Sequence, residues 1–228
     1  MPRDARATRD SLRRAGARLF AEQGIDAART RDIVAAAGQA NDSAITYHFG
    51  SRRGLLEEIL RAGVDRMEPA REAALATLDA TDLRAIVAAI VEPIADELLT
   101  DEGRDFVRIV VQVAGQAGIR SHTVPALIEG AAIARQLDLL GSCCRAFLPE
   151  PLALERISVV IAFLTAALAD RATTRGRTLL SHEAFATDLV DMLTAALNAP
   201  VSADLAESAD LAESAGLAES AELTSRLG

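Results

Sequence analysis

The residues whose types and spacing could do chemistry lie in the first quarter of the chain. Thr30 opens a short run with helical apolar spacing that Gly38 ends, and the segment Ile45-Thr-Tyr-His-Phe-Gly-Ser-Arg52 follows a polar turn. Hydroxyl, amide, imidazole and guanidinium groups donate hydrogen bonds, and phosphate oxygens and base edges accept them. The cluster therefore favours binding to a nucleic acid.

Three helices are expected to position these side chains. The first runs from about Thr8 to Glu22 and ends before Gly24. Its evidence is a set of apolar residues recurring at i, i+3, i+7 and i+8, namely Leu12, Ala15, Leu19 and Phe20.

Two shorter helices follow it. Thr30 is a good N-cap for a helix that ends at Ala37, Asp32 suits its first turn, and Gly38 suits its left-handed end. After the turn, Asn41 or Asp42 is expected to cap a helix over 43–49. Ile33, Val34, Ala37, Ile45 and Phe49 are predicted to form the core that holds the pair together. Two short helices around a glycine-containing turn describe a helix-turn-helix.

Charge separates this segment from the rest of the chain. Residues 1–54 hold ten arginines against six acidic residues, whereas the whole chain carries a net charge of −9. Such asymmetry indicates a basic nucleic-acid module on an acidic body.

The order of these features resembles the N-terminal signature of TetR/AcrR-family regulators. That signature reads T-x-x-x-I-A-x-x-A-G-V-S, then Y-x-H-F or Y-H-F, then x-S-K-x-x-L, and here it covers about residues 10–60. The stretch from Gly38 to Tyr47 is one residue longer than the common form, and arginine replaces lysine after Ser51. The resemblance implies a DNA-binding transcriptional regulator, most often a repressor, that acts as a symmetric dimer on a near-palindromic operator and responds to a small ligand.

The second short helix is the element that fits a major groove, and phosphate contacts are expected around it. Each assignment has a structural alternative: Thr30 as a cap alone, Tyr47 as a packing residue and His48 as an ordinary surface histidine. The predicted DNA-contacting residues are Thr30, Gln39, Asn41, Ser43, Thr46, Tyr47, His48, Arg52 and Arg53.

The remaining chain is predicted to be all-α, so the fold class is an N-terminal three-helix domain followed by a helical bundle. Ser51 is expected to cap a linking helix that runs to Pro69, and five helices follow at about 82–99, 103–117, 125–147, 153–171 and 182–198. The expected domains are 1–50 for DNA binding, 51–200 for effector binding and dimerisation, and 201–228 as a low-complexity tail. The tail repeats leucine every six residues, which gives no continuous apolar face, although a partner-binding helix is the alternative.

The body is assigned two roles through the resemblance, dimerisation and effector binding. The predicted dimer interface comprises Ile157, Val160, Ile161, Leu164, Leu168, Phe185, Leu189, Met192, Leu193 and Leu197. A largely apolar effector is expected between apolar side chains, with polar groups to orient it. Each of these apolar residues has a structural alternative as ordinary core. The predicted pocket comprises Phe106, Ile109, Gln112, Val113, Gln116, Arg135, Phe147 and Phe163.

Other classes fit less well. The sequence holds no Glu-x-x-His pair, C-x-x-C, P-loop or G-x-S-x-G, so no enzyme, metal or cofactor is expected. Cys143 and Cys144 are adjacent and suit a reducing compartment, as buried residues or as a thiol sensor. The apolar stretch 157–169 is shorter than a membrane span, and a cytoplasmic protein is expected. A helical scaffold protein and a helical-bundle enzyme remain the rival functions.

Overall fold

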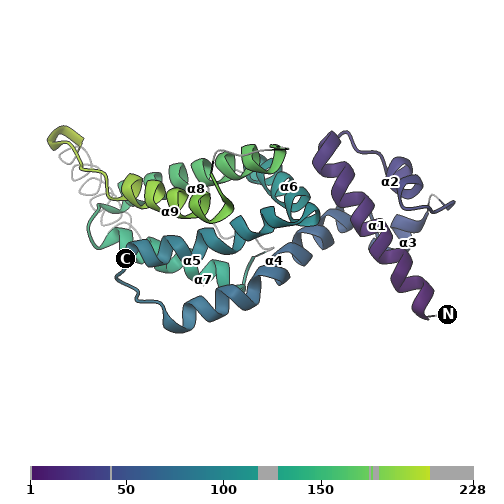
Figure 1. The fold of residues 1–228 in the computed structure, drawn as a ribbon, viewed down its shortest axis with the longest axis horizontal. Coiled ribbons are helices and arrows are strands. Elements are labelled where there is room, and N and C mark those ends of the chain that lie inside the picture. The colour runs from purple at the N-terminus through teal and green to yellow at the C-terminus, as the bar shows by residue number, and fades with distance from the viewer. Residues whose placement is uncertain (1, 42, 118–127, 175, 177–179, 206–228) are drawn as a thin grey trace, which may run out of the picture.

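A computed structural model describes residues 2–41, 43–117, 128–174, 176 and 180–205. Every regular element among these residues is helical, as expected. Three helices form a small head at one end of the molecule, and a long fourth helix leads from it into the body (Figure 1). These are α1 (Pro2–Gln23), α2 (Thr30–Ala36), α3 (Ala44–Phe49) and α4 (Arg52–Thr77).

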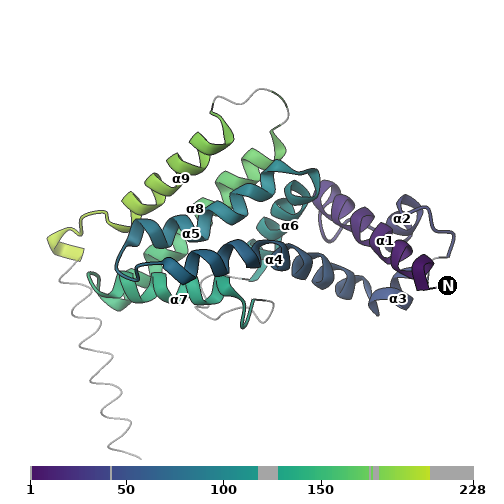
Figure 2. The same cartoon turned by 60° about the horizontal axis from the view of Figure 1, so that its bottom comes forward.

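In the body, α4 packs against α5, α6 and α7. In it α5 contacts α4, α7 and α9, while α8 contacts α6 and α9 (Figure 2). Its elements are α5 (Leu83–Asp96), the 3₁₀-helix η1 (Glu97–Leu99), α6 (Asp101–Ala117), α7 (Ala132–Arg145), α8 (Glu150–Thr173) and α9 (His182–Leu197).

Two predicted boundaries are wrong. Helix α4 does not stop at Pro69 but continues to Thr77. Pro69 has no N–H, so the carbonyl of Asp65 loses its helical hydrogen bond. Both residues are exposed, so water can donate a hydrogen bond to that carbonyl. Helix α7 begins at Ala132 rather than near residue 125, because Gly130 has a positive φ of 78° and Ala131 is extended. The segment 118–127 and the predicted tail from residue 206 lie outside the described residues.

The second internal proline needs a different solution because it is buried. Pro93 lies inside α5, so the carbonyl of Ala89 has no helical N–H donor. The Nη1 atom of Arg71, on α4, lies 3.4 Å from this oxygen and 3.3 Å from that of Ile90. A buried guanidinium from one helix therefore replaces the donor that a proline removes from its neighbour.

A small polar group surrounds that guanidinium. Arg71 is 3% exposed, and its Nη1 also donates to the side-chain oxygen of Gln136 at 2.6 Å. Burial lowers the pKa of Arg71 to about 10, against the opposing charge of Glu68. The Nε2 atom of Gln136 and one carboxylate oxygen of Glu68 are buried without a hydrogen-bond partner among the described residues. The body thus carries unused hydrogen-bonding capacity between α4, α5 and α7.

Candidate nucleic-acid interface

The head is held together by the apolar residues that the sequence pattern predicted. Leu12, Phe20, Ile33, Val34 and Ile45 are each at most 1% exposed. Gly24 and Gly38 adopt positive φ values of 96° and 69°, so both helices that they follow end where a glycine permits a left-handed turn. This core fixes α2 and α3 against α1.

Helix α3 presents its polar residues outward. Ala44 and Ile45 are buried against the head, whereas Ser43, Thr46 and Tyr47 are exposed, Tyr47 to 81%. The rings of Tyr47 and His48 meet edge to face, with centroids 4.9 Å apart. A short helix with a buried apolar side and an exposed polar side has the form of a groove-reading element.

The turn before α3 is organised differently from the predicted cap. Asn41 does not cap the helix; its Oδ1 accepts hydrogen bonds from the backbone N and the hydroxyl of Ser43, at 3.0 and 2.7 Å. The N-cap position is Ser43 itself, without a side-chain bond. The amide of Gln39 donates back to the Ala37 carbonyl at 3.4 Å. These contacts shape the turn that delivers α3, and Ser43 stays exposed.

Thr30 and the two arginines after Ser51 occupy three different environments. Thr30 is the first residue of α2 rather than its cap, which is Arg29. Ser51 caps α4 as predicted, accepting from the backbone N of Gly54 at 3.0 Å. Arg53 is on the surface, with its side chain 87% exposed and paired with Glu57.

Arg52 lies in a different environment from Arg53. Its Nε donates to the Ala28 carbonyl at 3.0 Å, its guanidinium lies over the Phe20 ring at 5.3 Å, and its Nη2 is buried. Arg52 therefore has a structural role inside the head that the sequence prediction of a DNA contact did not include.

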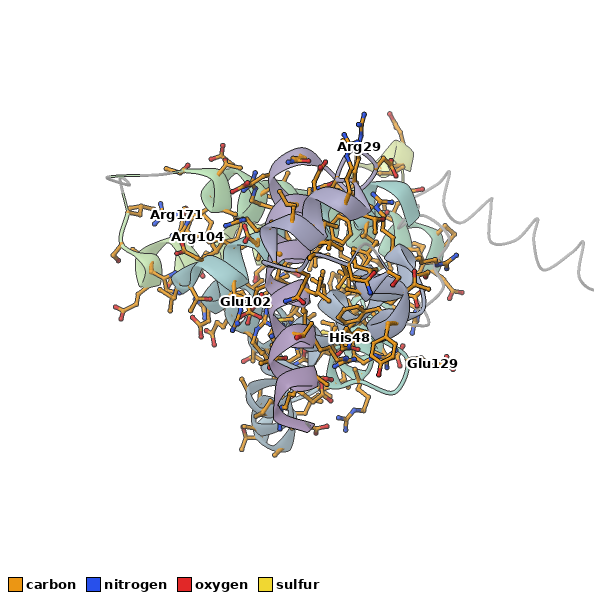
Figure 3. All side chains as sticks on the ribbon, turned by 90° about the vertical axis from the view of Figure 1, so that its right-hand side faces the viewer. Arg29, His48, Glu102, Arg104, Glu129 and Arg171 are labelled. Carbon is orange, nitrogen blue, oxygen red and sulfur yellow. The ribbon has the colours of Figure 1, made fainter. Side chains whose placement is uncertain are left out.

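Sequence reasoning missed two exposed arginines next to α2. Arg29 precedes the helix and projects outward from the head in Figure 3. Arg31 is 67% exposed and lies 3.4 Å from the carboxylate of its neighbour Asp32. Helical periodicity could have found Arg31, since it lies about 200° around the helix from the buried Ile33.

Comparison with known proteins identifies this arrangement. Residues 12–59 match the family model for bacterial regulatory proteins of the tetR family, and this range runs from the middle of α1 to the first third of α4. The head of this chain therefore carries the DNA-binding domain of the tetR family. This match supports a role in DNA-binding regulation.

Solved structures agree with this TetR-type fold. The TetR family regulator PfmR from Thermus thermophilus aligns over 81% of this chain and 96% of its own, at 24% identity and a TM-score of 0.51. The fatty acid degradation regulator FadR from Bacillus halodurans aligns over 84% and 95%, at 16% identity and a TM-score of 0.54. No curated protein matches the chain in sequence.

The predicted pocket residues in the body do not line one cavity. Phe106 and Ile109 are core, while Val113 is half-buried. Arg135 is exposed and paired with Glu72. Gln112 is bonded to the head, and the side chain of Gln116 is not described.

The two remaining aromatic walls lie elsewhere. Phe163 is 41% exposed on α8, and Phe147 is 46% exposed after α7. Phe147 lines a cavity of about 580 Å³ with Leu83, Leu139 and Cys143. That cavity lies where α5 begins and α7 ends, away from Phe106 and Ile109 on α6.

The predicted dimer interface is also corrected. Six of its ten residues are buried within the single chain, because the same apolar stripe packs α8 and α9 against each other and against the rest of the body. These six are Val160, Leu164, Leu168, Leu189, Leu193 and Leu197. Ile157, Ile161 and Phe185 are half-buried, and Met192 is 40% exposed.

A different face of α8 is apolar and open. Val159 is 63% and Phe163 41% exposed, and the small residues Ala162 and Ala166 are exposed beside them. By length and composition α8 could span a membrane, with mean hydropathy 1.9, whereas the prediction considered only the shorter stretch 157–169. Core helices of soluble proteins pass the same test.

Metal binding and thiol redox chemistry can each be compared with the described side chains. The described residues hold no group of three or more His, Cys, Asp or Glu side chains that suits a metal ion. Burial raises the pKa of the Cys144 thiol to about 11, and burial together with Asp82 and Asp79 raises that of Cys143. A raised pKa leaves little thiolate at neutral pH, so neither thiol is activated for redox chemistry.

Proposed function

We propose that the chain is a cytoplasmic repressor that binds a near-palindromic operator as a homodimer and leaves it when a small apolar ligand binds the body. The observation that carries the proposal is α3, whose Ser43, Thr46 and Tyr47 face outward from a buried Ala44–Ile45 base. Major-groove readers present polar side chains in this way, on a short helix anchored by a small core.

The open face of α8 supports the homodimer. Val159, Ala162, Phe163 and Ala166 follow the i, i+3, i+4, i+7 spacing of one helix face, and Met192 on α9 is exposed as well. An exposed apolar face of this kind is typical of an interface. A two-fold axis through it would give the dimer two heads, and two α3 helices suit half-sites about 34 Å apart, one turn of DNA.

Charge supports binding to DNA backbone as well as bases. Arg29, Arg31 and Arg53 are exposed on the head, so they are free to displace counterions from phosphates. Thr30 and His48 are proposed as further phosphate donors, and Gln39 and Asn41 as groups that hold the turn.

The DNA-binding part is tested by selecting duplexes from fragmented genomic DNA with the purified protein. We expect enrichment of fragments that share an inverted repeat, with an affinity that falls steeply as salt rises. Thr46→Ala is the matched variant, since it removes one exposed hydroxyl from α3 and leaves the buried base intact. Failure to enrich any shared sequence at low salt would contradict the proposal.

The effector part rests on the unused polar atoms in the body. The amide nitrogen of Gln136, unpaired among the described residues, lies between α4, α5 and α7 beside the buried Arg71, so it can orient one polar group of a largely apolar ligand. Gln136 and Arg71 thus take the orienting role predicted for Gln112 and Arg135.

A release assay tests the effector part. Apolar small molecules are added to the operator complex, and any that release the protein are retested on Gln136→Leu. We expect this variant to bind the operator normally and to need more ligand for release. An unchanged response would place the effector elsewhere.

A further inference from the structure

One side chain of α6, Gln112, joins the body to the head by hydrogen bonds. Its Oε1 accepts from the backbone N of Ile25 at 2.9 Å, and its Nε2 donates to the Phe20 carbonyl at 3.2 Å. The same nitrogen donates to the Arg108 carbonyl at 3.2 Å, within α6. One amide therefore joins the last turn of α1 and the start of the α1–α2 turn to the body.

Local conformation makes this contact possible. Gly24 has a positive φ of 96°, which turns the chain so that the N–H of Ile25 faces α6. The ring of Phe106 occupies the space where Gly63 would carry a Cβ, so α6 lies close against α4. Gln112 is consequently held at a fixed position when it meets α1.

A second link joins the same two helices near the start of α6. Glu102 lies 2.6 Å from Arg13 on α1 and 3.3 Å from Arg66 on α4. Arg66 is also paired with Glu97 and lies over the Phe106 ring at 5.5 Å. Figure 3 shows Glu102 beside α1 when the head is viewed end on.

The two links together fix an angle. Gln112 and Glu102 are ten positions apart on α6, which is about 15 Å at 1.5 Å per residue. Next to the Glu102 link α1 and α6 border a cavity of about 310 Å³, lined by Ala15, Ala17, Asp105 and their neighbours. The head is also anchored to α4, because Arg9 lies 2.9 Å from Glu58 and Gly16 lies against Leu55. Loss of one polar link should therefore loosen the angle of the head rather than free it.

We propose that Gln112 is a positioning residue that sets the angle of the head on the body and thereby selects the separation of the two operator half-sites. This rests on the proposed function, because half-site separation has meaning only for a dimer on DNA. A duplex with the wrong separation must break the Gln112 contact to be bound by both heads. The contact therefore lowers the affinity for duplexes with an incorrect spacing and does not affect base recognition.

The test uses the full-length protein and a duplex library. The half-site is first identified by selection from random duplexes, and pairs of half-sites are then separated by spacers that differ by one base pair. Gln112→Met keeps the side-chain length but removes both hydrogen-bonding groups. Gln112→Glu keeps the acceptor but places a carboxylate oxygen against the Phe20 carbonyl. Gln23→Met is the matched control, on an exposed glutamine at the end of α1.

We expect the wild type and Gln23→Met to favour one spacing. In both Gln112 variants the preference over the neighbouring spacings should fall by about five-fold, the scale of one net hydrogen bond, while binding to a single half-site stays unchanged. If Gln112→Met does not fold by circular dichroism, Glu102→Gln weakens the other link and should broaden the spacing in the same way.

An unchanged spacing profile in the folded variants would overturn the inference, and so would an equal loss of affinity at every spacing. If the wild type itself selects no paired half-sites, the proposed function fails instead. The two failures are therefore distinguishable.

Discussion

The head and the body of this chain use apolar residues in contrasting ways. In the head, the residues with helical spacing, such as Leu12, Ile33 and Ile45, are all buried. In the body, residues of the same types divide between two destinations: Leu193 is 1% exposed, whereas Val159 is 63% exposed. A local pattern is thus sufficient to define a small module, but it does not separate a core from an interface in a bundle.

Introducing a charge at a buried and at an exposed apolar residue of the body tests this difference most directly. Leu193→Glu should unfold the protomer rather than split a dimer, at a cost of about 4 kcal/mol, because a carboxylate would be buried unpaired. Phe163→Glu, on the open face of α8, should yield folded monomers. Sedimentation and circular dichroism separate the two results, with Leu205→Glu as the exposed control outside α8 and α9. A folded monomer from Leu193→Glu would instead support the dimer interface predicted from the sequence.

The Arg71–Pro93 pair tests whether the body depends on contacts between helices. Arg71→Met should cost about 2–3 kcal/mol, because it leaves buried acceptors at Ala89 and Gln136 unpaired. Pro93→Ala restores an N–H for the Ala89 carbonyl, so the double variant should recover about 1 kcal/mol of that loss. Denaturant unfolding of all four proteins measures the coupling, and strict additivity would rule out the bridging role of Arg71.

Within the head, Thr46 is expected to read sequence. Thr46→Ala should weaken binding to the preferred operator by about 1–3 kcal/mol and leave binding to unrelated duplexes unchanged. Competition between the two kinds of duplex measures this ratio. Equal losses on both would assign Thr46 to the backbone instead.

Arg52 and Arg53 sharpen the distinction between structure and binding inside the head. Arg53→Ala should lower the salt dependence of DNA binding by about one counterion without changing the melting temperature. Arg52→Ala should instead lower stability by about 1 kcal/mol, since it removes the hydrogen bond to Ala28. Salt titrations and thermal melts on both variants measure the two effects. A loss of stability in Arg53→Ala together with a lower salt dependence in Arg52→Ala would contradict this assignment.

The smallest effect is expected at the junction of head and body. Burial raises the pKa of Asp105, opposed by the charge of Arg108 and assisted by Glu22 and Asp101. The folded chain therefore binds this proton more tightly than the unfolded chain, and stability falls as pH rises from the ordinary value of 3.8 through the raised pKa. Asp105→Asn should be slightly more stable than the wild type at neutral pH, and the gain should vanish below the ordinary value. Melts across this pH range check the sign.

The sequence by itself determined the head and the order of the helices. Glycines at 24 and 38, the Ser51 cap and the apolar periods act within a few residues, so local conformational preferences are sufficient to predict them. The exposed polar residues of α3 follow from the same period.

Only the tertiary structure decided which side chains join distant segments. Gln112 bonds to Ile25 across 87 positions, Arg71 donates to α5, and Arg52 turns back to Ala28. No residue type or spacing encodes such pairings, because each depends on how two helices pack together. The opposite faces of α8 differ for the same reason, since burial is a property of the assembled bundle rather than of the helix.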